Sequence, residues 1–329
     1  MNFIKNQVDE LNLELTVHLD PADYAELEKK KLAAYRKQAD FKGFRKGNVP
    51  ASLILKVYGE RILAEAVEET LSQALGKFIE DEKLNVLGEP LTSAKQGELV
   101  WKSGEAFDFA FDLGLSPKVE VEVSKDDTVP VYTITSTAAE KEEMSKYLKQ
   151  LHESRKEEVS DEDLEKEVSE RVSENHKRES EWRLEKDIRD FYVEKSGVKL
   201  PEEFLKRWLL HANEGKVTAE QVESEFPGFV ADFKWQFVLR ALMEKLGLEV
   251  TSDDVKTEAE NYVRSQYAMY GISDAPAELI ENAAKDMLSD SKQADRIVEY
   301  VQNHKLMEKV KGEITLKSKR ISADKFKEL

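Results

Sequence analysis

Apolar and polar residues alternate strictly near the start of the chain. Leucine or valine stands at every odd position from 11 to 19, and polar residues stand between them. This period of two predicts a β-strand with one buried face. Asp20-Pro21 then combines an N-cap residue with a proline in the first turn of a helix. We expect this helix to end near Asp40, with an apolar side made of Tyr24, Leu27, Leu32 and Tyr35.

A second helical stretch follows at about residues 51–84, with a candidate break at Gly59. Its apolar residues are spaced to cover one face of a sheet. Strand patterns return at Leu99–Trp101 and over residues 107–113, where phenylalanine or leucine occupies every second position. Together these elements predict an α+β domain over residues 1–114.

Helical patterns dominate the rest of the chain. Residues 115–135 are expected to be extended, because Val119, Val121 and Val123 alternate with glutamate. Residues 153–190 are heavily charged around a narrow apolar stripe, which is typical of a solvated helix with one buried edge. The predicted fold class is therefore an α+β amino-terminal domain followed by an elongated, mostly α-helical carboxy-terminal domain. Its further expected features are helices after Pro201, at Phe229–Leu246, after Thr251, after Ala275 and at 294–310, a break at Phe226–Gly228, and a short strand at Ile314–Lys319.

The composition limits the chemistry that this chain can carry. Its 329 residues leave room for two or three domains, and its formal net charge of −17 argues against broad, non-specific nucleic-acid binding. It has no cysteine, so it offers neither a disulfide nor a thiolate nucleophile. No apolar segment approaches the ~20 residues that span a bilayer, and no secretory signal is expected at the start. The sequence shows no nucleotide-binding glycine loop, metal-binding histidine pair or Ser/His/Asp grouping, so no cofactor, metal or catalytic residue is expected.

One loop carries charge of the opposite sign. Residues 43–50, Gly-Phe-Arg-Lys-Gly-Asn-Val-Pro, place an aromatic ring beside two cations, between two glycines and before a closing proline. Residues 28–46 contain eight basic and only two acidic residues, a surplus of six positive charges in an acidic chain. Such a concentration favours docking on a negative partner in one orientation. The alternative interpretation is an ordinary turn with a solvated cationic tip.

The loop and its setting resemble trigger factor, a family of ribosome-associated bacterial chaperones. The family carries a Gly-Phe-Arg-x-Gly-x-x-Pro signature between two helices, and its positions are matched here by Gly43, Phe44, Arg45, Gly47 and Pro50. The resemblance covers residues 1 to about 149 and resumes from about residue 164 to the end. Many members carry a basic residue at the position of Asn48, so the resemblance implies somewhat weaker docking here.

The resemblance also points to a domain that is missing. The family normally inserts a prolyl isomerase domain of the FK506-binding type, which needs a curled sheet and an aromatic-lined pocket. Between Thr133 and Glu181 this chain has a single aromatic residue, Tyr147, in a helical and charged pattern. We therefore expect a ribosome-binding domain at 1–114, a linker at 115–160 where the isomerase domain is missing, and a helical chaperone domain at 161–329.

The resemblance implies roles for two sets of residues. The first is expected to bind the large ribosomal subunit at the tunnel exit and comprises Gly43, Phe44, Arg45, Lys46 and Gly47. The second is expected to contact unfolded or nascent polypeptides and comprises Phe226, Phe229, Met243, Met269, Tyr270 and Met287. Methionine suits a surface that accepts many sequences, but the same residues also fill gaps in helix cores.

The expected function is an ATP-independent, cytoplasmic chaperone that docks on the ribosome, binds nascent polypeptides and delays their misfolding. No membrane or specific nucleic-acid partner is expected, and a homodimer off the ribosome is left open. Three alternatives remain: a prolyl isomerase with a degenerate domain, a ribosome-independent helical holding chaperone, and a helical scaffold without clients. The aromatic-poor middle of the chain disfavours the first alternative, and the cationic loop disfavours the second.

Overall fold

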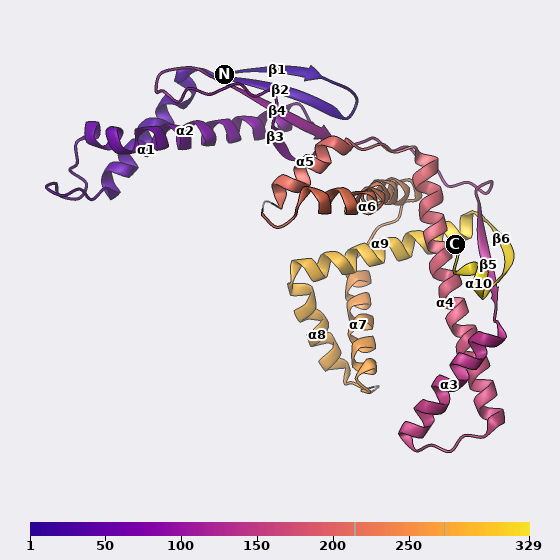
Figure 1. The fold of residues 1–329 in the computed structure, drawn as a ribbon. Helices are drawn as coiled ribbons and strands as arrows, with labels where there is room; N and C mark the ends of the chain where they lie inside the picture. The colour runs from indigo at the N-terminus through magenta and orange to yellow at the C-terminus, as the bar shows by residue number, and fades with distance from the viewer. Residues whose placement is uncertain (214, 273) are drawn as a thin grey trace. The chain divides into compact units, whose positions relative to one another are not determined.

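The structure, a computed structural model, describes residues 1–213, 215–272 and 274–329 and divides into two compact units (Figure 1). Unit 1 consists of Met1–Lys118 and Lys199–Asp232, and unit 2 consists of Val119–Val198 and Phe233–Leu329. The division does not follow the order of the chain, because the stretch that begins at Lys199 belongs with the amino-terminal residues. The functional segments expected at 1–114, 115–160 and 161–329 stay a prediction, since compactness assigns no role to a segment.

The sheet of unit 1 comprises β1 (Asn2–Gln7), β2 (Asn12–Leu19), β3 (Val86–Thr92) and β4 (Phe107–Leu115). The strands are antiparallel in the order β1-β2-β4-β3. In β2 the residues alternate between fully and partly buried, as the period of two predicts. The turn before β2 is held by Asp9, whose carboxylate accepts hydrogen bonds from the backbone N–H groups of Leu11 and Asn12 at 2.7 and 2.9 Å.

Helices α1 (Pro21–Gln38) and α2 (Ala51–Asp81) pack against each other in unit 1. Helix α2 runs through Gly59 without interruption, so the candidate break there is wrong. Its later turns bury Leu63, Val67 and Leu71 against the sheet. Its earlier turns contribute Ile54 to a separate small core near the loop. Helix α2 therefore contributes buried residues to both cores.

Helix α5 (Glu202–Ala212) packs on β3 and β4 within unit 1. Two glycines make this close approach possible. A Cβ at Gly114 would overlap the ring of Phe204, and a Cβ at Gly88, whose φ is +69°, would overlap the indole of Trp208. Arg207 adds an ion pair to the same surface. Aromatic rings of α5 thus occupy space that any larger residue in the strands would take.

In unit 2, β5 (Thr128–Thr135) and β6 (Thr315–Ser322) form a two-stranded parallel sheet. Helix α4 (Asp161–Ser196) packs along β5, and its Ile188 and Tyr192 are fully buried. They lie in one core with residues of α6 (Ala219–Leu246) and α9 (Ser291–Glu313). The Tyr192 hydroxyl donates a hydrogen bond to Asp127 at 2.9 Å, and burial together with this bond raises the pKa of Tyr192. The short helix α10 (Ala323–Phe326) follows β6.

Two helical pairs extend unit 2. Helix α3 (Ala138–Arg155) packs on α4 around Leu148 and Val168. The ring nitrogens of His152 lie 2.9 Å from both Glu157 and Glu167, and these bonds raise the pKa of His152. The hairpin of α3 and α4 is therefore fastened by charge as well as by apolar contact.

The second pair consists of α7 (Ser252–Met269) and α8 (Ala277–Ser289), and both helices contact α9. The expected cap at the start of α7 is confirmed, because the Thr251 side chain accepts a hydrogen bond from the N–H of Asp254. The Lys305 ammonium lies 2.5 Å from the Asp254 carboxylate and lowers the pKa of Asp254 to about 2. The first turn of α7 is thereby tied to α9.

Several expectations about local structure are wrong. Residues 99–101 form no strand, and the Phe226–Gly228 break lies inside α6, which continues through Pro227. Phe226 and Val230 are buried on either side of this proline, and their packing holds the segment helical. Strands β1 and β3 were not predicted, whereas the short strand expected from residue 314 is confirmed as β6.

Replacing Gly114 with alanine tests the packing of α5 on the sheet. The new methyl group would overlap the Phe204 ring, so we expect the free energy of unfolding to fall by ~1–3 kcal/mol. Gly76→Ala is the control, since Gly76 lies in α2 with open space around its Cβ position. Alanine there should raise stability by ~0.5–1 kcal/mol. Urea unfolding measures both changes, and a Gly114→Ala protein of unchanged stability would contradict the packing.

Candidate functional site

Two consecutive tight turns shape the loop between α1 and α2. A backbone hydrogen bond of 3.0 Å from Phe44 N–H to the Phe41 carbonyl closes the first turn, and one of 2.9 Å closes the second, at residues 45–48. Gly43 and Gly47 stand third in these turns with φ of +95° and +83°. Glycine adopts this left-handed conformation without strain. In Figure 1 the loop lies at the end of the α1–α2 pair that points away from the sheet.

A small core fixes both ends of the loop. Val49 is fully buried beside Ile54 of α2, and its carbonyl accepts a hydrogen bond from Arg36 Nε at 2.8 Å. At the other end, Phe41 packs edge-on against Tyr58, with ring centroids 6.2 Å apart. Because both ends are anchored, the residues between them stay at the surface.

Phe44, Arg45 and Lys46 form an exposed tip, which we call the cationic tip. Phe44 is 43% exposed despite its apolar ring, and both basic side chains are exposed. Within the described residues, neither Arg45 nor Lys46 has an ion-pair partner. The tip therefore offers two charges and one ring to a partner.

Basic residues farther from the tip are partly neutralised. The Lys31 ammonium lies 2.8 Å from Glu69, and this contact raises the pKa of Lys31. The Tyr35 hydroxyl donates a hydrogen bond to Glu65, and together with Arg61 at 3.0 Å it lowers the pKa of Glu65. Part of the positive surplus of residues 28–46 is thus balanced by α2, whereas the cationic tip keeps its charge.

Four of the six candidate client-binding residues lie in or against packed cores. Phe226 is 5% exposed in unit 1, under the ammonium of Lys206, and Met243 is 8% exposed in the core of unit 2. Phe229 is half-buried beside Phe226, and Met287 is half-buried against the core of α7 and α8. Their burial fits the alternative that these residues fill gaps in helix cores.

The other two candidates, Met269 and Tyr270 at the end of α7, are 72% and 81% exposed. The sequence reasoning missed a second surface in unit 2, which combines exposed aromatic rings with charged side chains. Trp182 of α4 is 65% exposed and lines a groove of about 580 Å³ with Tyr300 and His304 of α9. Tyr300 and His304 are four residues apart, a spacing that places them on the same face of a helix, and their rings stack. This spacing was the signal in the sequence for the aromatic surface. We call these three residues the aromatic groove.

The described residues offer no sign of a metal site. Among them, no group of three or more histidine, aspartate or glutamate side chains is placed to hold a metal ion. In the same part of the chain, no helix is long and apolar enough to cross a membrane. What the surface does present is the cationic tip, the Met269–Tyr270 pair and the aromatic groove.

Comparison with protein families accounts for most of the chain. Residues 1–151 match the family model described as "Bacterial trigger factor protein (TF)", and residues 180–329 match "Probable trigger factor, C-terminal domain". The chain belongs to the trigger factor family. The amino-terminal match contains the sheet of unit 1 and the loop with its cationic tip, so the resemblance noted in that loop is confirmed at the level of the family.

Curated relatives agree with this assignment. A trigger factor of Geobacter sp. (strain M21) is 36% identical over 122 residues, which are 37% of this chain and 25% of the relative. A trigger factor of Xanthobacter autotrophicus is 26% identical over 147 residues, 44% of this chain and 32% of the relative. The chain thus spans about a quarter to a third of the length of these relatives.

A solved structure shares the fold. It is described as "Promiscuous Substrate Recognition in Folding and Assembly Activities of the Trigger Factor Chaperone". The similarity covers 94% of this chain and 99% of that chain, with a TM-score of 0.53 and 14% sequence identity. At this identity the likeness concerns the fold alone, and it agrees with the predicted class of an α+β amino-terminal region and a helical carboxy-terminal region.

The isomerase domain of the family is lacking between the two matches. Only residues 152–179 separate them, and these residues form the end of α3, a short connection and the start of α4. The segment is a helical hairpin, with no curled sheet in it. The α3–α4 hairpin therefore stands at the place where the family normally carries that domain.

Proposed function

We propose that this trigger factor family member is an ATP-independent cytoplasmic chaperone that docks on the large ribosomal subunit and holds nascent polypeptides. The observation that carries the proposal is the cationic tip, which is exposed on a well-packed base and forms no ion pair among the described residues. Its charge contrasts with the −17 of the whole chain, so a negative partner would meet the protein at this place.

The three side chains of the cationic tip would act in different ways. Arg45 can make a two-pronged contact with a carboxylate or phosphate, because its guanidinium is planar. Lys46 adds a less directional charge, and Phe44 can fill a small apolar recess. The two glycines would keep the backbone tight enough for all three to reach one surface.

Holding an unfolded chain requires exposed apolar area that accepts many sequences. Met269 and Tyr270 supply such area at the end of α7, and the exposed rings of Trp182 and Tyr300 add to it between the charged side chains of the aromatic groove. Methionine is flexible and polarisable, and aromatic rings combine large contact area with few rotatable bonds. These surfaces support the proposal of client binding by unit 2.

Changing Phe44, Arg45 and Lys46 together to alanine tests the docking. Loss of the ring and both charges should weaken ribosome binding at least about tenfold, since a few central residues carry most of the energy of an interface. Co-sedimentation with purified ribosomes at several protein concentrations measures the change. The matched control changes Lys146, Tyr147 and Lys149 to alanine.

Like the tip variant, this control removes two positive charges and one exposed aromatic residue, but from helix α3. It should sediment with ribosomes like the unaltered chain. Equal binding of the tip variant and the unaltered chain would refute docking by the loop. Suppression of aggregation without any co-sedimentation would favour the ribosome-independent holding chaperone.

Site-specific photo-cross-linking from stalled nascent chains tests the client surfaces. Cross-linkers placed at Tyr270 and Trp182 should capture the nascent chain several times more often than one placed at Val100, which is equally open to solvent in unit 1. The difference is expected because Tyr270 adjoins the exposed Met269 and Trp182 shares its groove with the rings of Tyr300 and His304, whereas Leu99 and Trp101 beside Val100 are partly buried in the core of unit 1. Cross-links confined to residues 1–114 would defeat client binding by unit 2.

The alternative of a degenerate prolyl isomerase is tested directly. The purified chain should leave the cis/trans exchange of a proline peptide at its spontaneous rate, which has a time scale of about tens of seconds. The reason is that residues 152–179 form a helical hairpin where the isomerase domain would stand. A protease-coupled assay measures the rate, and a clear acceleration would restore the enzyme as a candidate.

A further inference from the structure

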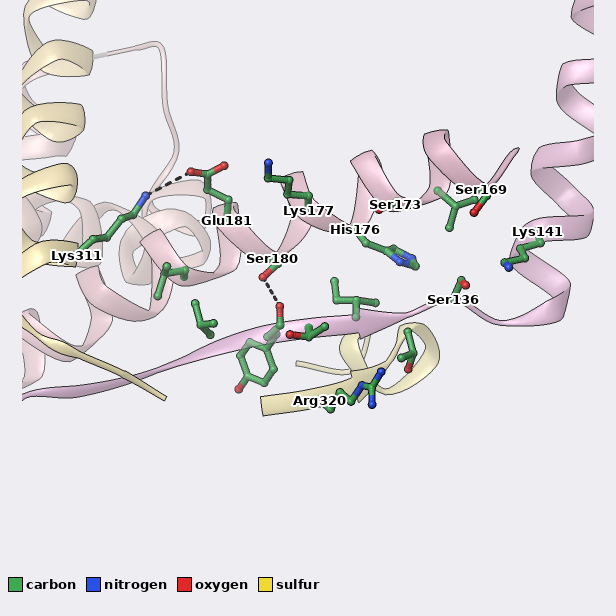
Figure 2. A pocket seen from close by; sticks show the side chains of 17 residues that line it. Ser136, Lys141, Ser169, Ser173, His176, Lys177, Ser180, Glu181, Lys311 and Arg320 are labelled. Atoms are coloured by element: carbon green, nitrogen blue, oxygen red, sulfur yellow. Dashed lines mark hydrogen bonds and ion pairs between the residues drawn. The ribbon is translucent and has the colours of Figure 1, made fainter. Parts of the chain in front are cut away.

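The two strands of the sheet in unit 2 have different surroundings on their outer sides (Figure 2). Along β5, α4 packs against the strand, and the Ser180 hydroxyl donates a hydrogen bond to the Tyr132 carbonyl. Figure 2 shows Arg320 of β6 on the side of β5 that faces away from α4. The edge of β5 is therefore covered, whereas β6 has a partner strand on one side only.

Alternate residues of β6 point their backbone groups to its outer edge. The Thr315 N–H donates a hydrogen bond of 2.8 Å to the Asp127 carbonyl, on the β5 side. In parallel pairing the N–H and C=O of one residue point to the same side, and those of the next residue point to the other. Leu316, Ser318 and Arg320 therefore direct both groups outward, where no described residue bonds to them. These three residues offer donors and acceptors to an additional strand.

The outer edge of β6 is open to solvent. The residues from Thr315 to Arg320 are all exposed, including the apolar Leu316. Helix α10 contacts both strands, and its Phe326 packs edge-on against Tyr132 with ring centroids 5.7 Å apart. Because α10 reaches β5 as well as β6, it covers a face of the sheet and leaves the edge accessible.

This edge is positively charged in an acidic protein. Residues 315–329 contain five basic and two acidic residues, and Lys317, Lys319 and Arg320 belong to β6 itself. None of these three cations has an ion pair within the described part of the chain. The Lys319 ammonium lies 5.6 Å from the centre of the Tyr132 ring, a contact that leaves its charge in place. Side chains alternate along a strand, so Lys317 and Lys319 share one face and Arg320 lies on the other.

The lysines of β6 make its edge selective. Lysine on an edge strand normally discourages pairing with another strand, because its charge is then held beside apolar or like-charged neighbours. A strand that carries carboxylates has the opposite effect, since opposite charges directly across two strands stabilise the pair. The charges of β6 therefore disfavour most strands and favour an acidic one.

We propose that the outer edge of β6 binds a short, extended, acidic polypeptide segment as a third strand of this sheet. The inference rests on the proposed chaperone function, because the segment would belong to a client. The backbone of β6 would hold the main chain of the segment, and the three unpaired cations would meet its carboxylates. A single-stranded nucleic acid fits less well, because its bases stack on exposed rings, whereas Tyr132 is buried and Phe326 is half-buried against it.

Labelled peptides test the inference on the full chain. The probe is a fluorescein-labelled heptapeptide of alternating aspartate and valine, which places every aspartate on one face of an extended strand. One comparison peptide has lysine in place of each aspartate. Fluorescence anisotropy should show at least about tenfold weaker binding of this peptide, because its charges repel those of β6. A second comparison peptide has proline in place of each valine. It keeps the carboxylates but loses backbone donors, and it should bind severalfold more weakly.

Two variants of β6 locate the site. Lys317→Glu with Lys319→Glu reverses the charge of one face and should weaken binding of the aspartate peptide at least about tenfold. Ser318→Pro removes a backbone donor that points outward, so the pairing with β5 keeps its hydrogen bonds while the peptide loses one. This second variant should weaken binding severalfold without any change in charge.

The matched control is Lys149→Glu with Lys166→Glu. It makes the same change in net charge on exposed residues of the α3–α4 hairpin, and it should bind the aspartate peptide like the unaltered chain. Far-UV circular dichroism of every variant checks that the fold is retained. If Ser318→Pro does not fold, the lysine pair and the three peptides decide the question.

Four results would overturn the inference. They are no binding of the aspartate peptide, equal binding of the aspartate and lysine peptides, equal binding of the aspartate and proline peptides, and unchanged binding by either β6 variant in its folded form. Preferential binding of a labelled uridine oligonucleotide to this edge would also overturn it and assign the charge to nucleic acid. Ribosome co-sedimentation and suppression of aggregation by the lysine variant separate the two proposals, because both should persist if the edge alone is misassigned.

Discussion

Helix α2 joins the two cores of unit 1, and the geometry of the loop depends on it. Its 31 residues extend ~46 Å at 1.5 Å per residue. The first turns bury Ile54 with Val49 at the base of the loop, and the later turns bury Val67 and Leu71 against the sheet. Because one helix takes part in both cores, the position of the cationic tip is set by the packing that stabilises the sheet. The residues of the tip need only keep the turn open and the side chains exposed.

Local patterns predicted those elements whose burial follows a single period. Strand β2 alternates between fully and partly buried residues, so its pattern was visible. Strand β1 is mostly exposed on both faces, and β3 contains Gly88 and Pro90, so neither shows that alternation. The pairing of β5 with β6 joins Thr128 to Thr315 and depends on the fold of everything between them. A period can identify each strand, but it does not choose the partner.

The same distinction separates the candidate sites. The cationic tip could be predicted, because its glycines, ring and charges are consecutive in the sequence and its exposure needs only anchors on either side. The aromatic groove could not be predicted, because its rings come from positions as distant as Trp182 and Tyr300. For a related reason the sequence did not distinguish exposed client candidates from buried ones. Met243 and Met269 have the same side chain, and only packing decides that one is buried and the other exposed.

Net charge is an average, and the surface that meets a partner is governed by charges within a short distance. At physiological salt the Debye length is about 8 Å, so more distant exposed charges are largely screened. The first carboxylate of α2 is Glu60, nine residues after Ala51 and therefore ~14 Å along the helix axis. Close to the cationic tip, Asp40 is the acidic residue that the sequence supplies between Glu28 and Glu60. The carboxylates of α2 are therefore largely screened at the cationic tip. For this reason the tip can act as a basic surface on a chain of charge −17.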